Sequence, residues 1–275
     1  MSVEARPKII GSAVQRTEDP RLLTGNGRFI DDISLPRMLH VAFCRSDYAH
    51  ARIVSINSGD AEAMPGVMGV YTAQDLEGDF QPIRATSRMA DYYATEIVPL
   101  ARDKVRYVGE AVVAVVANNR YLAEDAAENV TIDYDPLGNA IDPLANLSEH
   151  STLLHEDAET NILVTRTFHR GDVDVVMNDA TVRVQDTFRM HRKTPTAIEN
   201  RGYVAEYDQG RRTLTLHSTT QISGIVRDAL EEILGIPGNR LRVIAPDMGG
   251  GFGGKASLYP CLLYTSPSPR AATLA

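Results

Sequence analysis

The sequence has little cysteine and no excess of basic charge, and each shortage excludes a class of protein. Its two cysteines, Cys44 and Cys261, lie far apart and lack the close spacing of metal ligands. We therefore expect neither a disulfide framework nor a zinc site, and we interpret both as structural thiols. A formal net charge of −8 with scattered basic residues argues against nucleic-acid binding, which needs a basic face.

Long apolar segments are also missing. The longest apolar run, Ala111 to Ala117, is far shorter than the roughly 20 residues that a membrane-spanning helix needs. The N-terminus, MSVEARPKII, lacks the apolar core of an export signal. We therefore expect a cytoplasmic protein with no membrane span.

The first half of the chain shows the pattern of a mixed layer domain. We predict strands in LHVAFCRS, in the segment through Val70, in the buried run that ends at Ala117, and in VTIDYDPL. A short helix capped by Thr72 and an amphipathic helix in NNRYLAEDAAENV are expected between them. Strands mixed with short helices are typical of an α+β or α/β layer domain rather than of a helix bundle.

The second half predicts an open sheet with one long helix. Alternating apolar residues indicate strands in ATVRVQDTFRM, GYVAEYD and RTLTLHSTT. The helix ISGIVRDALEEILG carries an apolar stripe and ends at Gly235. A last strand, NRLRVIAPD, leads into a run of glycines.

The glycine run, GGGFGGK, is the main candidate site. Gly249 to Lys255 match the spacing of a phosphate-binding loop, but Ala256 replaces the Ser or Thr that would hold magnesium, and no helix is predicted to follow. Without side chains, the backbone could instead approach a flat or bulky ligand closely. The run could equally be a tight turn without a ligand, with Phe252 buried as a core residue.

Four side chains outside the glycines are weaker candidates. Gln221 follows a predicted strand, where its amide could donate to a ligand oxygen or only cap a turn. Lys255 could bind a phosphate, face solvent or pack. Glu110 and Glu199 stand near recognisable motifs, but an isolated glutamate is usually a hydrogen-bonded or solvated group.

Several stretches together resemble one enzyme family. The stretches RTEDPRLLTGNGRFIDDISLPRMLHVAFCRSDYAHARI, PLARDKVRYVGEAVVAVVA, AIENRGYVAEYD, STTQ and APDMGGGFGGK occur in the order seen in molybdenum-binding large subunits of the xanthine dehydrogenase and aldehyde oxidase family, including carbon monoxide dehydrogenase-like members. The resemblance covers about residues 9 to 260. It implies an α+β fold, in which an α/β hammerhead domain precedes the beginning of a truncated molybdopterin-binding domain.

The resemblance also implies a cofactor site. Gln221 is expected to hydrogen-bond an oxo ligand of molybdenum, and the backbone of Gly250, Gly251, Phe252 and Gly253 to lie against the molybdopterin, so that Gln221 and Phe252 approach the metal without ligating it. The pterin sulfurs hold the metal, which agrees with seven dispersed histidines. The family chemistry adds water-derived oxygen to an aldehyde, N-heterocycle or similar substrate. Iron-sulfur clusters and FAD are expected on partner subunits of an oligomeric complete enzyme.

The resemblance also divides the chain. We expect an N-terminal extension over 1–18, the hammerhead domain over 19–143, a linker over 144–163, the partial molybdopterin-binding domain over 164–260, and a non-native tail over 261–275 that resembles translated adapter sequence. The glutamate that serves the family as general base is not among these residues, so no catalytic residue is assigned and the fragment alone is expected to be inactive.

One sequence feature bears on the substrate, and two alternative functions remain. Ala256 stands where purine-oxidising members carry a glutamate, which argues against xanthine as substrate. A phosphate-loop nucleotide-binding protein and a non-catalytic scaffold domain remain as alternative functions.

Overall fold

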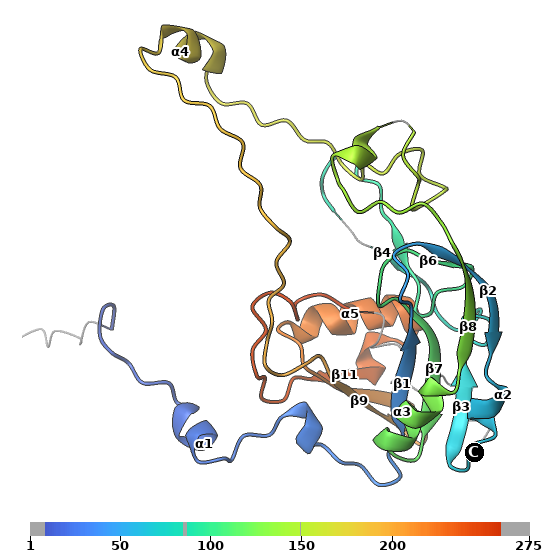
Figure 1. The fold of residues 1–275 in the computed structure, drawn as a ribbon. Helices are drawn as coiled ribbons and strands as arrows, with labels where there is room; N and C mark the ends of the chain where they lie inside the picture. Colours follow the sequence, from blue (N-terminus) through green and yellow to red (C-terminus); the bar gives the residue numbers. More distant parts are fainter. Residues whose placement is uncertain (1–8, 85–86, 149, 260–275) are drawn as a thin grey trace, which may run out of the picture.

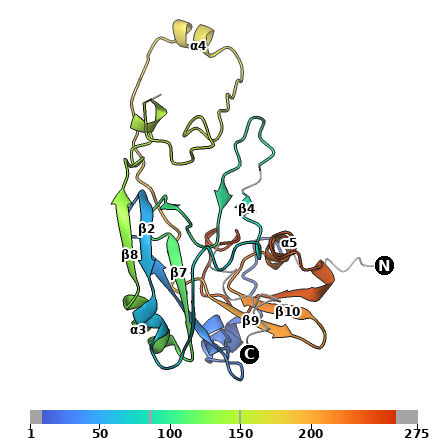
Figure 2. The same ribbon diagram turned by 90° about the vertical axis from the view of Figure 1, so that its right-hand side faces the viewer.

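The computed structural model describes residues 9–84, 87–148 and 150–259, and these form two units that lie side by side (Figures 1 and 2). The first unit contains two three-stranded antiparallel sheets. One sheet has the order β1 (His40–Arg45), β7 (Ala111–Ala117), β3 (Val67–Tyr71), and the other has the order β6 (Lys104–Val105), β2 (Ala51–Asn57), β8 (Thr131–Pro136).

The core of the first unit lies between its sheets and its helices. The helix α3 (Arg120–Glu128) begins at Asn119, whose side chain accepts a hydrogen bond from the amide of Leu122 at 2.9 Å. Its buried face, with Ala123 and Ala126, packs against β1 and β7. Most of β7 is fully buried, which explains its unbroken apolar sequence.

Six further short elements lie in the part of the chain that precedes the arm. They are α1 (Asp19–Leu23), η1 (Ile30–Asp32), α2 (Gly59–Glu62), β4 (Ile83–Arg84), β5 (Glu96–Ile97) and η2 (Ala145–Leu147). The predicted helix capped by Thr72 is wrong, because residues 73–79 form turns. The backbone amide and the hydroxyl of Thr72 both donate to the Asp75 carboxylate at 2.7 Å, which closes a local turn instead of starting a helix.

The second unit is a three-stranded sheet with a helix on one face. The strands are β9 (Tyr203–Asp208), β10 (Thr213–Ser218) and β11 (Leu241–Ile244), in the order β11-β10-β9. The helix α5 (Ser223–Leu234) connects β10 to the parallel strand β11, and the short η3 (Gly238–Arg240) precedes β11. Gly235 ends α5 with a φ of 63°, as the sequence predicted.

An extended arm leads from the first unit out to α4 and back to the second unit (Figure 1). It carries α4 (Val173–Asp179) at its tip, and the expected strand ATVRVQDTFRM forms no ladder among the residues that the structure describes. Its alternating apolar residues Val182, Val184, Phe188 and Met190 are 79 to 90% exposed. Alternation predicts a strand correctly only where a neighbouring strand supplies hydrogen bonds and an apolar surface, and here neither is present.

One contact between the two units involves α5. The backbone amide of Gln81 donates to the carbonyl of Ile233 at 2.9 Å, and Phe80 and Ile83 pack against the core that α5 forms with its sheet. No helix within the described parts of the chain is long and apolar enough to cross a membrane.

Candidate functional site

The topology of the second unit brings Gln221 and the glycine run together. The strands β10 and β11 are parallel neighbours, with Ser218 and Ile244 at their carboxyl ends. The segment that carries Gln221 leaves the first strand and the segment that carries the glycines leaves the second, so both emerge at the same sheet edge. Ligand sites in sheets with parallel strands occur at this edge. We call residues 249–255 the glycine loop.

The side chain of Gln221 is fixed against the glycine loop. Its Oε1 accepts hydrogen bonds from the amides of Gly253 at 3.0 Å and Lys255 at 3.2 Å. Its own backbone amide donates to the carbonyl of Lys255 at 3.0 Å. Two N–H donors at one atom identify that atom as the oxygen. The Nε2 group therefore points away from these contacts and has no partner in the described chain.

Four glycines of the loop are required by close contacts with the chain itself. A Cβ would lie 2.6 Å from Glu199 Cβ at Gly249, 2.7 Å from Gln221 Cδ at Gly251 and 2.7 Å from Pro195 Cγ at Gly254. At Gly250, which has a φ of 100°, a Cβ would lie 3.3 Å from Ala197 Cβ. Most of the glycines thus allow residues 195–199 and Gln221 to approach the backbone.

The tip of the loop faces open space. Gly253 has a φ of 87°, and a Cβ there would meet nothing within 4 Å. Phe252 adopts a φ of 49° and is 75% exposed, so its interpretation as a buried core residue is wrong. A positive φ at a non-glycine residue is strained and tends to occur at functional sites.

Backbone donors remain free in the same loop. Among the described residues, the amides of Gly250, Gly251 and Phe252 have no hydrogen-bond acceptor, whereas those of Gly249, Gly253, Gly254 and Lys255 each have one. Successive amides in a backbone that changes the sign of φ can bind an anion or a polarised oxygen. Together with the Gln221 amide nitrogen, they offer donors to a ligand at one sheet edge.

The structure gives Lys255 a structural role. Its side chain is 4% exposed, and its Nζ lies 3.0 Å from Glu199 Oε2. No helix begins after it in the described chain, where residues 252–257 form turns and bends. A phosphate-binding lysine needs a free ammonium group next to a helix N-terminus, so this geometry does not support the nucleotide-binding alternative.

Two of the remaining candidates, Glu110 and Cys44, lie apart from this edge, whereas Glu199 contacts the glycine loop. Glu110, in the first unit, accepts a hydrogen bond from the backbone amide of Arg106 at 2.5 Å, and burial raises the pKa of its carboxyl group. Burial likewise raises the pKa of the Cys44 thiol to about 11, which makes it unreactive. Cys261 lies outside the described residues. Within the described ranges, no cluster of His, Cys, Asp or Glu could hold a metal ion.

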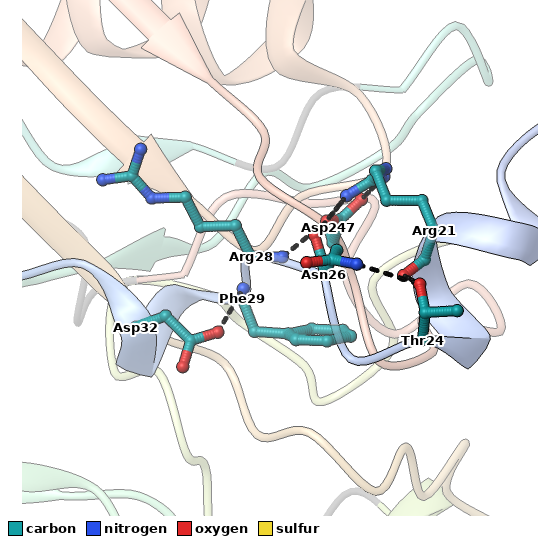
Figure 3. Close-up of polar contacts among 7 residues, drawn as sticks. All are labelled: Arg21, Thr24, Asn26, Arg28, Phe29, Asp32 and Asp247. Carbon is teal, nitrogen blue, oxygen red and sulfur yellow. Dashed lines mark hydrogen bonds and ion pairs between the residues drawn. The ribbon is translucent and has the colours of Figure 1, made fainter.

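A contact that the sequence analysis did not predict holds the strand leading into the glycine loop, and we call its residues Arg21, Arg28 and Asp247 the clamp (Figure 3). Asp247, three residues after β11, accepts hydrogen bonds from Arg21 Nη1 at 2.5 Å and Nη2 at 2.6 Å. It also accepts one from the backbone amide of Arg28 at 2.7 Å, and its own amide donates to the Arg28 carbonyl. The N-terminal segment is thereby tied to the strand exit.

We expect Asp247→Ala to release this N-terminal segment. The hydrogen bonds from Arg21 and Arg28 lower the pKa of Asp247. A lowered carboxyl pKa contributes stability above the ordinary value and loses it as the pH falls below that value, so the clamp should hold unchanged from about pH 5 to 8. Hydrogen exchange at residues 21–28 should accelerate in Asp247→Ala and less in Asp247→Asn. Asp228→Ala, which removes a local pair with Arg227, is the matched control, and equal exchange in all variants would contradict the clamp.

The contact between Gly251 and Gln221 yields a second prediction. In Gly251→Ala the new methyl group must displace the Gln221 side chain, so the amides of Gly253 and Lys255 should lose protection from hydrogen exchange. Gly253→Ala introduces no clash, but its positive φ should cost about 1 to 2 kcal/mol of stability while the Lys255 amide stays protected. The same loss of Lys255 protection in both variants would show that the contact does not position Gln221.

Comparison with known proteins places both units. The family model described as the aldehyde oxidase and xanthine dehydrogenase a/b hammerhead domain matches residues 24–138, and the model of the molybdopterin cofactor-binding domain matches residues 154–266. The first unit and the second unit are therefore the two domains that the sequence predicted, in that order. The exact boundaries stay predictions.

Individual relatives agree with these matches. The chain is 37% identical over 252 residues to the nicotine 6-hydroxylase large subunit of Paenarthrobacter nicotinovorans, covering 92% of this chain and 31% of the relative. It is 38% identical over 266 residues to the carbon monoxide dehydrogenase large chain of Afipia carboxidovorans, covering 91% and 32%. The crystal structure of quinoline 2-oxidoreductase from Pseudomonas putida 86 superimposes with a TM-score of 0.90 at 37% identity, covering 98% of this chain and 34% of that one.

The chain thus spans about a third of the length of these relatives. It contains a hammerhead domain followed by residues of a molybdopterin-binding domain, and the similarity extends over nearly all of it. The chain belongs to the xanthine dehydrogenase and aldehyde oxidase family of molybdenum-binding large subunits.

Proposed function

We propose that this chain forms one wall of the molybdopterin site in a molybdenum hydroxylase large subunit. The carrying observation is that Gln221 is held through its Oε1 so that its amide nitrogen stays free, beside three unpartnered amides at Gly250, Gly251 and Phe252. These four free groups are all hydrogen-bond donors. Such an edge fits a ligand that presents oxygen or negative charge.

These residues fit molybdopterin. In this family the pterin sulfurs hold the metal, so the protein needs no cluster of ligating side chains. A fixed amide donor and nearby backbone amides can instead hydrogen-bond the oxygen atoms of the cofactor. The exposed Phe252 adds a flat apolar surface next to them.

When bound, the cofactor would supply the redox centre at which water-derived oxygen is added to a substrate carbon. In this proposal, Gln221 and the glycine loop orient the cofactor through hydrogen bonds, and Phe252 limits the approach of water and substrate on that side. The substrate is an aldehyde, an N-heterocycle or a similar small molecule. Iron-sulfur and flavin partner subunits would carry the electrons away, as expected from the family.

Cofactor content tests the proposal. A complete molybdenum subunit that contains this segment should copurify with molybdenum and pterin in a ratio near one per subunit, measured by metal analysis and by fluorescence of the oxidised pterin. It should not bind an ATP analogue in the presence of magnesium. A subunit that folds and assembles but contains neither molybdenum nor pterin would refute the proposal.

A further inference from the structure

We propose that Glu199 is a positioning residue that joins both ends of the glycine loop and thereby sets the direction of the Gln221 amide nitrogen. The consequence of Glu199 for catalysis rests on the proposed function, whereas its effect on the glycine loop does not. Glu199 lies in the segment AIENRG, between the extended arm and β9, and no role follows from its sequence position.

One carboxylate oxygen makes the connection. Glu199 Oε2 accepts a hydrogen bond from the backbone amide of Gly249 at 2.8 Å, at the start of the loop. The same oxygen accepts one from Lys255 Nζ at 3.0 Å, at the end of the loop. The backbone amide of Glu199 also donates to the carbonyl of Gly249 at 3.3 Å. The loop is therefore closed by a single side chain.

The end of the loop is in turn joined to Gln221. The backbone amide of Lys255 donates to Gln221 Oε1 at 3.2 Å. Its carbonyl accepts hydrogen bonds from the Gln221 amide at 3.0 Å and from the Thr220 hydroxyl at 3.2 Å. A displacement of Lys255 would therefore move the atom that holds Gln221 Oε1. Glu199 therefore acts on the Gln221 amide group through Lys255.

Burying the ion pair of Lys255 and Glu199 costs desolvation free energy. The side chains of Lys255 and Glu199 are 4% and 14% exposed, so both charges have lost most of their hydration. Glu199 Oε1 is buried and has no hydrogen-bond partner among the described residues. A buried ion pair with an unsatisfied oxygen adds little net stability, so stability alone does not account for it. Positioning of the loop does.

Three variants separate positioning from stability. Glu199→Gln leaves the Lys255 charge unpaired, and Lys255→Met leaves the Glu199 charge unpaired. The double variant Glu199→Gln/Lys255→Met removes both charges and restores neutrality, but not the connection across the loop. Glu232→Gln, at an exposed position on α5, is the control.

Hydrogen exchange on this chain gives the first readout. We expect the amides of Gly253 and Lys255 to exchange about tenfold faster or more in all three Glu199 and Lys255 variants, since a hydrogen bond to a charged group is lost. Any acceleration of hydrogen exchange at the β10 amides in the single variants should disappear in the double variant. Recovery of the loop amides together with β10 in the double variant would overturn the proposal, because the pair would then contribute only stability.

A complete subunit containing this segment gives the second readout. The double variant should retain its molybdenum content, but lower kcat about tenfold or more at unchanged substrate KM and alter the Mo(V) resonance spectrum. A double variant with wild-type kcat and spectrum would overturn the proposal. A complete wild-type subunit that contains no molybdenum, together with faster loop exchange in the Glu199 and Lys255 variants of this chain, would instead refute the proposed function and leave the loop connection intact.

Discussion

Gln221→Glu should lower the kcat of a complete molybdenum subunit containing this segment by about 100- to 1000-fold, the usual effect of removing one fixed donor from a reacting oxygen. The substitution separates two properties of the side chain. A carboxylate still offers an oxygen to the amides of Gly253 and Lys255, which now contact Gln221 Oε1. It cannot donate a hydrogen bond, because a negatively charged oxygen takes the place of the free Nε2 group.

The glycine loop should therefore stay ordered while activity is lost. The measurement combines steady-state kinetics and molybdenum content of the complete subunit with hydrogen exchange of residues 249–255 in this chain. Gln221→Ala should lose both activity and loop protection, because it removes acceptor and donor together. Gln209→Ala, in the exposed turn between β9 and β10, should change neither. Near-normal turnover in Gln221→Glu would mean that the amide nitrogen has no role at the reacting centre.

Leu216→Ala should destabilise the second unit by about 2 to 5 kcal/mol, the usual range for deleting a buried leucine side chain. Leu216 is fully buried in β10 and packs in one cluster with Val226, Leu230 and Ile233 of α5. That helix and strand position Gln221 and hold β11, which leads into the glycine loop. The substitution should therefore loosen the candidate site without touching it.

The first unit should be much less affected, because its buried residues form separate clusters around β7. Hydrogen exchange at increasing denaturant should show earlier opening of β10 and α5 and little change in β7. Thr215→Ala, on the partly exposed face of β10, controls for the loss of a side chain from the strand. If the amides of β7 and β10 opened at equally lowered denaturant concentrations, the two units would not be separable. Contacts such as that from Gln81 to Ile233 would then make them unfold together.

Periodicity predicted those elements that have one buried face, even where the partner strand lies far away in the sequence, as for β1 and β7. The strands β1, β3, β7, β8, β9, β10 and β11 and the helices α3 and α5 were expected, because the order of apolar and polar residues in each segment indicates its buried face. The helix after Thr72 was wrong, since an acceptor three residues away at Asp75 competes for the same donors. The extended arm shows the same limit on a larger scale: its alternation is present, but the strands that would pair with it are not.

The candidate site was predicted in part. Motif resemblance selected Gln221 and residues 250–253, and parallel pairing of β10 and β11 brings these residues together. The sequence interpretation treated the glycines as one surface for a ligand. The structure divides them, because Gly249, Gly251 and Gly254 are needed by neighbouring side chains and Gly253 faces open space.

The sequence by itself determined the class of protein, the order of its two domains and the residues of the donor edge, since these follow from local pattern and motif. Only the tertiary structure decided what each of those residues contacts. Glu199 lies 50 residues before Gly249 and 56 before Lys255, and Arg21 lies 226 before Asp247. Contacts at such separations depend on how the whole chain packs, and no spacing rule along the sequence encodes them.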